Sequence, residues 1–276
     1  MVTQADKSAV FRALHARPRP FLIPNPWDRG SAMILESMGF EALATTSLGL
    51  ANVLGQSEVT LQQVIDNCRE ICEATRLPVN ADLENCFADE PRAAANAIRL
   101  ACEAGCVGGS IEDSTGDPKK PIYDFNLALE RVQATVEVAR SLPVPFMLTA
   151  RAENFLHGRK DMDDTIRRLQ AFEKAGADVL YAPGLHSLAE IRTVTSALKK
   201  PFNLVMGFAD PSITLDQLGE AGVKRVSIGG GLNRVALKAF MDAAKQMREG
   251  SFRFLPSMAS IAEVRGAFQR PAKTKA

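Results

Sequence analysis

The chain of 276 residues is long enough to bury a full core, either as one large α/β domain or as two smaller ones. Its hydrophobic fraction of 46%, charged fraction of 24% and formal net charge of +1 are those of an ordinary globular protein and give no electrostatic case for nucleic acid or a membrane as partner. No apolar run approaches the roughly 18 residues that span a bilayer, and the first 16 residues lack a signal-peptide core, so we expect a cytoplasmic protein.

Short β-prone runs alternate with longer amphipathic segments along the whole chain. Eight parallel strands with helices between them close a (β/α)8 barrel, whose usual length is about 250 residues, so the pattern predicts this TIM-barrel fold. The expected strands are 21–24, 42–47, 79–84, 109–113, 146–152, 179–182, 202–206 and 225–229. Helical apolar spacing is found in segments such as 62–75, 92–105, 127–141, 163–176 and 188–198.

Glycines punctuate the chain as helix ends would. Gly39, Gly105, Gly176 and Gly222 each follow a helix-like run, as C-cap glycines do. No linker or charge block divides the sequence, so we expect residues 1–276 to form one barrel domain with a helical extension from about residue 232 to 276. The structural rival, an open dinucleotide-binding sheet, would need a glycine-rich fingerprint that residues 25–30 do not supply.

Two further features have several interpretations. Residues 229–231 are three glycines after the last strand, where they could bind phosphate or simply turn into the final helix. The five cysteines are an odd number in a chain without a secretory signal, which favours buried thiols over disulfides. A zinc site is conceivable, but the cysteine spacing lacks a CxxC pair.

The chemistry is carried by carboxylates that follow two neighbouring strands. Alternate residues of a strand share a face, so Asp82 and Glu84 should point into the barrel mouth, where Glu112 joins them from the next strand. Carboxylate oxygens favour a hard divalent cation, Mg²⁺ first and Mn²⁺ second, and such a cation would relieve their mutual repulsion. The alternative is that Asp82 or Asp113 caps a helix or pairs with Arg151.

Arg151 ends the fifth predicted strand and is the candidate for binding substrate. A guanidinium binds a carboxylate through two parallel hydrogen bonds. An arginine beside a metal therefore suggests a small anionic substrate. The alternative is a structural ion pair with Glu112 or Glu153. Arg151 and Glu112 are thus the predicted catalytic residues.

Other candidates lie on the loops around this mouth. Thr46 and Ser47 end the second strand, where small hydroxyl residues let backbone N–H groups approach an anion, and Trp27, after the first strand, could wall the pocket or simply pack. His157 is more often a surface residue than an acid or base. The polar segment 114–123 is well placed for a lid that excludes water; its candidate residues are Thr115, Lys119 and Lys120.

Taken together, the motifs resemble the isocitrate lyase/phosphoenolpyruvate mutase superfamily. The similarity runs from about residue 21 to 231 and rests on residues 24–28, 81–84, 110–113 and 149–153. It implies a barrel whose last helix is swapped between subunits of a homodimer or homotetramer. It also implies Mg²⁺ held, partly through water, by Asp82, Glu84 and Glu112, and a 2-oxo or 2-hydroxy acid bound by Arg151, Thr46 and Ser47. The usual chemistry breaks or makes a C–C or P–C bond through an enolate.

Departures from the superfamily narrow the activity. Isocitrate and methylisocitrate lyases carry an acid/base cysteine in a K-[KR]-C-G-H lid, whereas Lys119 and Lys120 are followed here by Pro121. Those lyases also have a glutamate in the sixth strand and Asn-x-Thr in the seventh, where this chain has Tyr181 and residues 205–208, so a second carboxylate would meet no obvious cation. Authentic cleavage of isocitrate or methylisocitrate is therefore not expected. Glu58 could replace the usual aspartate after the second strand.

The sequence therefore predicts a Mg²⁺-dependent lyase that cleaves a C–C bond of a small 2-oxo acid or substituted malate, similar to oxaloacetate decarboxylase or to dimethylmalate and methylisocitrate lyases. One alternative is P–C chemistry, as a phosphonopyruvate hydrolase or phosphoenolpyruvate phosphonomutase, with Arg159, Lys119 and Lys120 as loose candidates for the extra positive charge. Another is a barrel that binds an oxo acid without turning it over.

Overall fold

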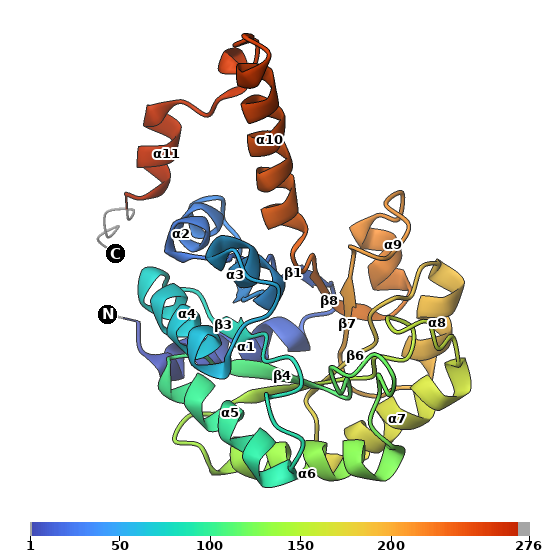
Figure 1. Cartoon of the computed structure of the whole chain (residues 1–276). Helices are drawn as coiled ribbons and strands as arrows, with labels where there is room; N and C mark the ends of the chain where they lie inside the picture. The colour runs from blue at the N-terminus through green and yellow to red at the C-terminus, as the bar shows by residue number, and fades with distance from the viewer. Residues whose placement is uncertain (1, 270–276) are drawn as a thin grey trace.

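The computed structural model describes residues 2–269 and shows eight parallel strands curled into a barrel (Figure 1). The hydrogen-bonded order is β1-β8-β7-β6-β5-β4-β3-β2. A bond from the Ala44 N–H to the Pro24 carbonyl, 3.1 Å long, joins the two end strands and closes the ring. The strands are β1 (Phe21–Leu22), β2 (Leu43–Ala44), β3 (Val79–Ala81), β4 (Gly108–Glu112), β5 (Met147–Arg151), β6 (Val179–Tyr181), β7 (Phe202–Val205) and β8 (Val223–Ser227).

Helices follow the strands and surround the barrel. Most begin at a Ser, Thr or Asp whose side chain accepts a hydrogen bond from the first turn, as at Asp28, Thr60 and Ser187. The helices are α1 (Gln4–Ala16), α2 (Arg29–Ser37), α3 (Ser47–Leu54), α4 (Leu61–Ala74), α5 (Pro91–Glu103), α6 (Phe125–Ser141), α7 (Met162–Ala175), α8 (Leu188–Ser196), α9 (Leu215–Glu220), α10 (Gly231–Arg248) and α11 (Ile261–Ala267), with a 3₁₀ turn, η1 (Leu255–Ser257).

The predicted TIM-barrel fold is confirmed, with all eight strands in place. Most strands are shorter than predicted, because the sequence pattern does not show where the ladder ends and the functional loop begins. Residues 82–84, for example, lie beyond β3, and 45–47 leave β2 to start α3. The last strand begins two residues earlier than predicted, at Val223.

Apolar packing fills the amino end of the barrel and leaves the carboxyl end for a polar site. Apolar residues that point outward from the barrel pack against the helices. Leu148 and Leu180 lie on strands, and Leu83 lies just after β3. At the amino ends of the strands, Phe11 and Leu14 of α1 pack against Phe21 and form a second apolar cluster. This cluster fills that end of the barrel with apolar side chains, so a polar site is expected at the carboxyl ends of the strands.

The chain after β8 leaves the barrel. Helix α10 projects beyond the other helices, and α11 returns to contact α2 (Figure 1). Neither α10 nor any other helix in the described part of the chain combines the length and apolarity needed to cross a bilayer.

The five cysteines are all free and buried, which confirms their predicted role as packing residues. Cys72 Sγ and Cys106 Sγ lie 3.6 Å apart. Within residues 2–269 no group of cysteine, histidine or carboxylate side chains has the arrangement of a zinc site.

His15 lies in the apolar plug beneath the barrel. Its ring meets Phe11 and Phe21 edge-on, with centroids 4.7 and 4.9 Å away, and its Nδ1 donates to the Phe11 carbonyl at 2.8 Å. Burial, aided by the nearby Arg225 guanidinium, lowers the pKa of His15 from 6.5 to about 3. The folded protein therefore holds this imidazole neutral.

In the unfolded chain the His15 ring takes up a second proton below pH 6.5, whereas in the folded chain it does so only near pH 3. The free energy of unfolding should therefore fall as the pH drops from 6.5 towards 3, by up to about 1.4 kcal/mol per pH unit. His15→Phe should remove this contribution. Urea unfolding at pH 7, 5.5 and 4.5 would show the wild-type free energy of unfolding declining relative to the variant. The exposed His157 provides a control, since His157→Gln should follow the wild type. Parallel curves for wild type and His15→Phe would contradict the assignment.

Candidate active site

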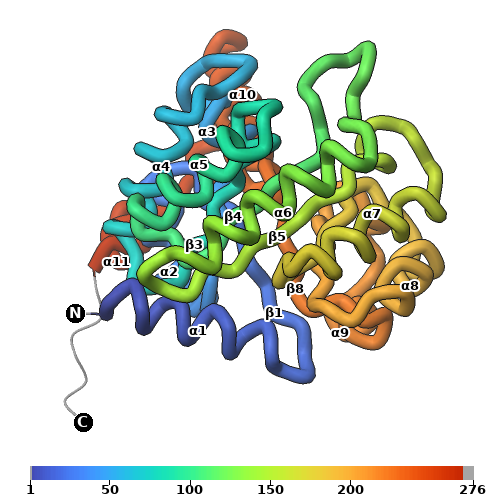
Figure 2. Tube along the Cα trace, turned by 90° about the horizontal axis from the view of Figure 1, so that it is seen from below, coloured from blue at the N-terminus to red at the C-terminus, as the bar shows by residue number. Residues whose placement is uncertain are grey.

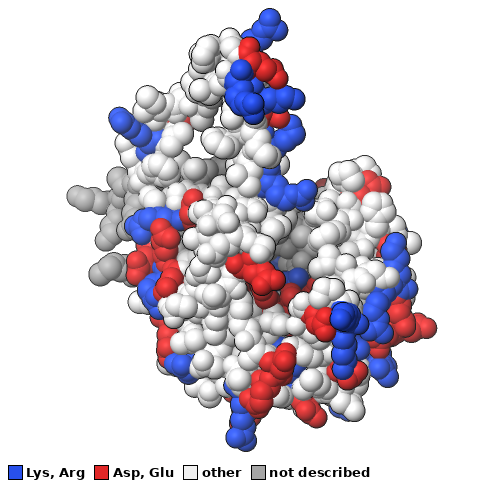
Figure 3. Space-filling model, viewed as in Figure 1, with Lys and Arg blue, Asp and Glu red and all other residues white. Residues whose placement is uncertain are grey.

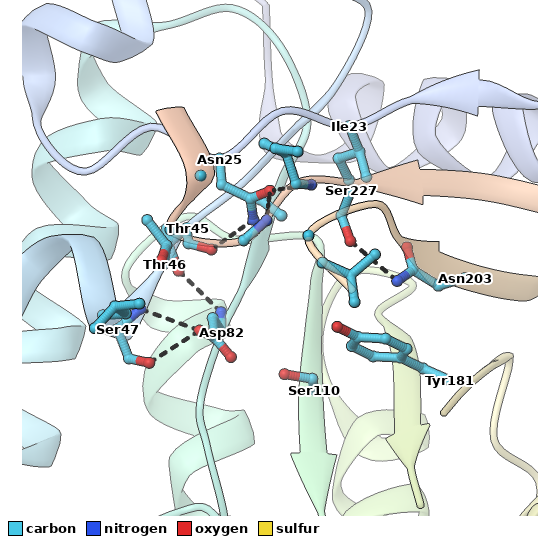
Figure 4. Close-up of a pocket in the computed structure, with 18 of the residues that line it drawn as sticks. Ile23, Asn25, Thr45, Thr46, Ser47, Asp82, Ser110, Tyr181, Asn203 and Ser227 are labelled. Atoms are coloured by element: carbon cyan, nitrogen blue, oxygen red, sulfur yellow. Dashed lines mark hydrogen bonds between the residues drawn. The ribbon is translucent and has the colours of Figure 1, made fainter. Parts of the chain in front are cut away.

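A cavity of about 340 Å³ opens at the carboxyl ends of the strands. That volume suits a small organic ligand. Its walls come from every strand or the loop that follows it, and Figure 4 shows polar side chains from opposite sides of the barrel, among them Asp82, Ser110 and Tyr181, facing one another across it. Charged atoms gather at the hollow in the middle of this face (Figure 3).

Asp82 is positioned by the start of α3. The backbone N–H and the hydroxyl of Ser47 both donate to Asp82 Oδ2 at 3.0 Å, while Thr45 Oγ1 accepts from the Asp82 backbone N–H at 2.9 Å (Figure 4). A helix N-terminus stabilises a carboxylate through its free N–H groups and its dipole. The hydroxyl of Thr46 caps the same helix by accepting from the Gly49 N–H. Ser47 and Thr46 both line the cavity, although their hydroxyl groups are already engaged within the protein, and their contact with a substrate stays a prediction.

Glu84 lies on an unusual loop. Its φ is 49°, and Cys86 and Phe87 also have positive φ, a conformation that costs a residue with a side chain about 1 kcal/mol or more. The buried guanidinium of Arg131 compensates by donating to the carbonyls of Asn85, Ala88 and Asp89, the last at 2.7 Å. Arg131 thus braces the loop that turns Glu84 into the cavity.

Arg151 lies at the centre of the site. Its Nε donates to Glu153 Oε1 at 2.7 Å, Nη1 lies 3.2 Å from Asp82 Oδ1, and Nη2 lies 3.0 Å from Glu112 Oε2. The guanidinium carbon also lies 4.7 Å from the centroid of the Tyr181 ring. The ion pairs with Glu112 and Glu153 that were the structural alternative are therefore present. Since a guanidinium has five N–H groups, two on the Nη atoms remain for a substrate carboxylate.

Carboxylates outnumber cations in the immediate surroundings of Arg151. Its guanidinium lies among Asp82, Glu84, Glu112 and Glu153, while two other arginines, Arg225 and Arg234, line other parts of the cavity. Burial, reinforced by Asp82, raises the pKa of Glu84; burial also raises the pKa of Glu112 well above its usual value, despite the opposing effect of Arg151. Both shifts arise mainly from burial, and the neighbouring carboxylates add to them.

The donor set fits a divalent cation that keeps part of its water shell. All three predicted ligands are carboxylates on one cavity, which suits Mg²⁺ or Mn²⁺. Within residues 2–269, however, no three carboxylate, histidine or cysteine side chains are gathered closely enough to bind a metal directly, since Arg151 engages an oxygen of both Asp82 and Glu112. A cation here would be held largely through water, with additional positive charge offsetting the surplus carboxylates.

Comparison with known proteins identifies the family. The family model described as phosphoenolpyruvate phosphomutase matches residues 11–248. The chain belongs to the isocitrate lyase/phosphoenolpyruvate mutase superfamily. Enzymes of this superfamily are lyases and mutases, and this chain is one of them.

Three relatives illustrate the match. A crystal structure of a Burkholderia cenocepacia J2315 protein, provisionally named a lyase/mutase, is 51% identical over 97% of both chains with a TM-score of 0.94. An oxaloacetate decarboxylase of Bradyrhizobium diazoefficiens is 30% identical, covering 91% of this chain and 88% of its own. The structure of 2,3-dimethylmalate lyase is 26% identical, covering 96% of this chain and 94% of its own, with a TM-score of 0.83.

Several predicted residues lie away from the cavity. Trp27 does not line it; its backbone N–H donates to the Ser31 hydroxyl of α2, and its carbonyl accepts from the Asn67 amide of α4. Asn25 lines the cavity instead, and its side chain bonds the Thr45 carbonyl and the Ile228 and Gly229 N–H groups. Among the loop candidates, Glu58, His157 and Arg159 are exposed and do not line the cavity.

The predicted lid is folded on itself. Ser114 and Ile122 form an isolated antiparallel bridge, and the Thr115 hydroxyl donates to the Lys120 carbonyl at 2.6 Å. None of the three candidates Thr115, Lys119 and Lys120 lines the cavity, and the segment projects from the barrel (Figure 2). Closure over the site stays a prediction.

Asp113 has neither alternative role considered from the sequence. It does not cap a helix or pair with Arg151; its Oδ1 accepts from the Glu153 N–H at 2.8 Å, and its Oδ2 pairs with the buried Arg168 at 3.0 Å. Burial raises the pKa of Asp113 to about 7, although Arg168 opposes that rise. This pair fixes the backbone next to Arg151 from outside the cavity.

The buried Arg168 should be essential for stability, whereas its neighbour should not. Arg168→Met leaves Asp113 buried without its cation, and the free energy of unfolding should fall by about 3–5 kcal/mol. Arg167→Met, at a side chain that is 61% exposed, should cost at most about 1 kcal/mol. Because protonation would neutralise Asp113, the Arg168→Met deficit should shrink between pH 8 and pH 5. Chemical denaturation measures both variants; equal losses would refute this account.

Proposed function

We propose that this protein is a divalent-cation-dependent lyase that cleaves a bond next to the oxygen-bearing carbon of a small 2-oxo or 2-hydroxy acid. The observation that supports the proposal is the convergence of Asp82, Glu84 and Glu112 with Arg151 on one cavity at the barrel mouth. A carboxylate cluster of this kind is unfavourable for an apolar ligand and suits a cation with an anionic substrate.

Asp82, Glu84 and Glu112 would hold Mg²⁺, or Mn²⁺ in its place, partly through water. When bound, the cation supplies positive charge that stabilises an enolate oxyanion. Ser47 holds Asp82 in place, and the Arg131-braced loop holds Glu84, so the chain contributes a prearranged set of oxygens.

Arg151 would orient the substrate. Glu153, Asp82 and Glu112 fix its guanidinium plane, so little conformational entropy is lost when a carboxylate binds its two remaining N–H groups. The segment 114–123 would then exclude water, with Thr115, Lys119 and Lys120 brought nearer by closure. The residue that transfers the proton is not assigned, since the lid cysteine of the isocitrate lyases has no counterpart here.

A substrate panel tests this proposal: oxaloacetate, 2,3-dimethylmalate, 2-methylisocitrate and phosphonopyruvate, each with Mg²⁺ and with a chelator. Pyruvate release above the metal-only blank is expected for at least one compound and should disappear on chelation. Arg151→Lys keeps the charge but loses the planar fork, and kcat/KM should fall at least about 100-fold. Arg167→Lys is the surface control and should be unaffected. Turnover that survives chelation, or that Arg151→Lys leaves unchanged, would refute the proposed roles.

P–C bond chemistry is the second candidate, and one observation favours it. Gly229, Gly230 and Gly231 at the start of α10 line the cavity together with Arg234, and such a helix start can receive a phosphonate. Release of inorganic phosphate from phosphonopyruvate in the same panel would support this candidate over C–C cleavage.

We also infer that the protein is a homo-oligomer in which a second copy covers α10 and the chain beyond it. Val235, Phe240, Met241 and Met247 of α10 are 54–70% exposed. Figure 3 shows mostly uncharged atoms on one side of the projecting helix, and isolated chains rarely leave large apolar patches uncovered. Exchange of this helix between subunits would bury them.

Phe240→Glu should therefore shift the assembly towards monomers, because a carboxylate would have to be buried at the contact. Light scattering coupled to size-exclusion chromatography measures the mass. Lys245→Glu, an exposed change of charge on the same helix, should leave the mass unchanged. A monomeric wild type would disprove the inference.

A further inference from the structure

A second arginine, Arg225 of β8, lines the cavity below Arg151. It is only 4% exposed. Its Nε donates to Asn203 Oδ1 at 2.7 Å and its Nη2 donates to Thr149 Oγ1 at 3.0 Å, both neutral partners. Its Nη1 is buried without a hydrogen-bond partner among residues 2–269, and no carboxylate in that range forms a salt bridge with it.

The depth of Arg225 follows from its contact with Thr149. Thr149 precedes Arg151 by two positions on β5, so their side chains share the inner face of the barrel about 6–7 Å apart along the strand. The guanidinium of Arg225 therefore lies one layer deeper than that of Arg151. Asn80, on the same floor, has an unpartnered Oδ1.

The two arginines have opposite surroundings. Arg151 is already compensated by three carboxylates, whereas no carboxylate in the described part of the chain, residues 2–269, pairs with Arg225. Burial, with repulsion from Arg151, lowers the pKa of Arg225 to about 9, so it remains charged at neutral pH but without a counter-ion. A buried, uncompensated cation beside a cavity is unfavourable and is stabilised by an anion that enters.

Asn203 helps to hold the guanidinium of Arg225 in place. Its amide oxygen accepts from Arg225 Nε, and its amide nitrogen donates to Ser227 Oγ at 3.1 Å (Figure 4 shows the second bond). Since both ends of the amide are engaged, Arg225 is held in one orientation, with Nη1 as its uncommitted end.

We propose that Arg225 binds a second carboxylate of the substrate, at the end remote from the carbon that Arg151 and the metal site hold. This inference rests on the proposed function, which it narrows to 2-hydroxy dicarboxylates of the substituted-malate type. A carboxylate matches the one free nitrogen of Arg225 better than a phosphonate, which requires more donors.

The position of this charge also selects the bond that breaks. In decarboxylation the remote carboxylate leaves as neutral CO₂, and a guanidinium paired with it would stabilise the substrate more than the transition state. In C2–C3 cleavage of a 2-hydroxy dicarboxylate, the 2-hydroxyl proton leaves, the C2–C3 electron pair moves onto the remote carboxylate as an enediolate, and a proton then adds at C3. The products are a 2-oxo acid and a saturated carboxylate. Arg225 would stabilise the extra negative charge, so it favours cleavage over decarboxylation.

Binding measurements separate this role from turnover. With Mg²⁺ present, calorimetric titration should show malate binding at least about tenfold more tightly than lactate, which lacks the second carboxylate. Arg225→Gln should abolish this difference and leave lactate binding unchanged. Lys224→Gln, whose side chain contacts the Arg17 and Pro18 carbonyls instead, should behave as wild type.

Equal binding of malate and lactate to the wild type would overturn the proposal, as would an equal loss of both in Arg225→Gln. If Arg225→Gln does not fold, Arg225→Lys keeps the charge and should retain part of the malate preference; complete loss in a folded Lys variant would also overturn it. Where cleavage of dimethylmalate occurs, Arg225→Gln should reduce it about 100-fold. A malate preference without turnover of any panel compound would disprove the proposed function and leave the binding role intact.

Discussion

The arrangement of the mouth depends on the guanidinium of Arg151, which holds Asp82, Glu112 and Glu153 from three different segments in one plane. Removing one partner from a buried charge pair typically costs several kcal/mol, so none of these groups can vary independently. The same contacts explain why the carboxylates do not form a ready metal cage. Their negative charge is partly neutralised by Arg151, and only the surplus is left to attract a cation.

Other buried arginines hold the segments around Arg151 in place from outside the cavity. Arg131 donates to three carbonyls of the loop that carries Glu84, and Arg168 pairs with Asp113, which in turn receives the Glu153 N–H. Each contact satisfies backbone or side-chain groups that would otherwise be buried without a partner. The positive φ at Glu84 is tolerated for this reason. Strain at the functional loop is offset by an arginine outside the cavity.

The sequence predicts the barrel well because its signals are local. Helix caps, glycine helix ends and the period of apolar residues set the elements. Of the three predicted carboxylates, Glu112 lies on a strand as alternation requires, whereas Asp82 and Glu84 follow β3 on a loop. What the sequence misses depends on how distant segments meet. Asp113 pairs with an arginine 55 positions away, and the Thr115 hydroxyl bonds to the Lys120 carbonyl within the lid segment.

Arg225 illustrates what the sequence can and cannot predict about the site. By resemblance alone, the sixth and seventh strands offer no cation to a second carboxylate of the substrate. A charged residue two positions before Ser227 on the last strand was a detectable signal, since alternation turns both side chains inward. That signal could not show that Thr149 and Asn203 would provide only neutral partners. Among residues 2–269 no carboxylate pairs with Arg225, because the closed barrel surrounds its guanidinium with Thr149 and Asn203. The cavity therefore combines carboxylates at its rim with a positive charge at its floor, which would orient a substrate that carries charge at both ends.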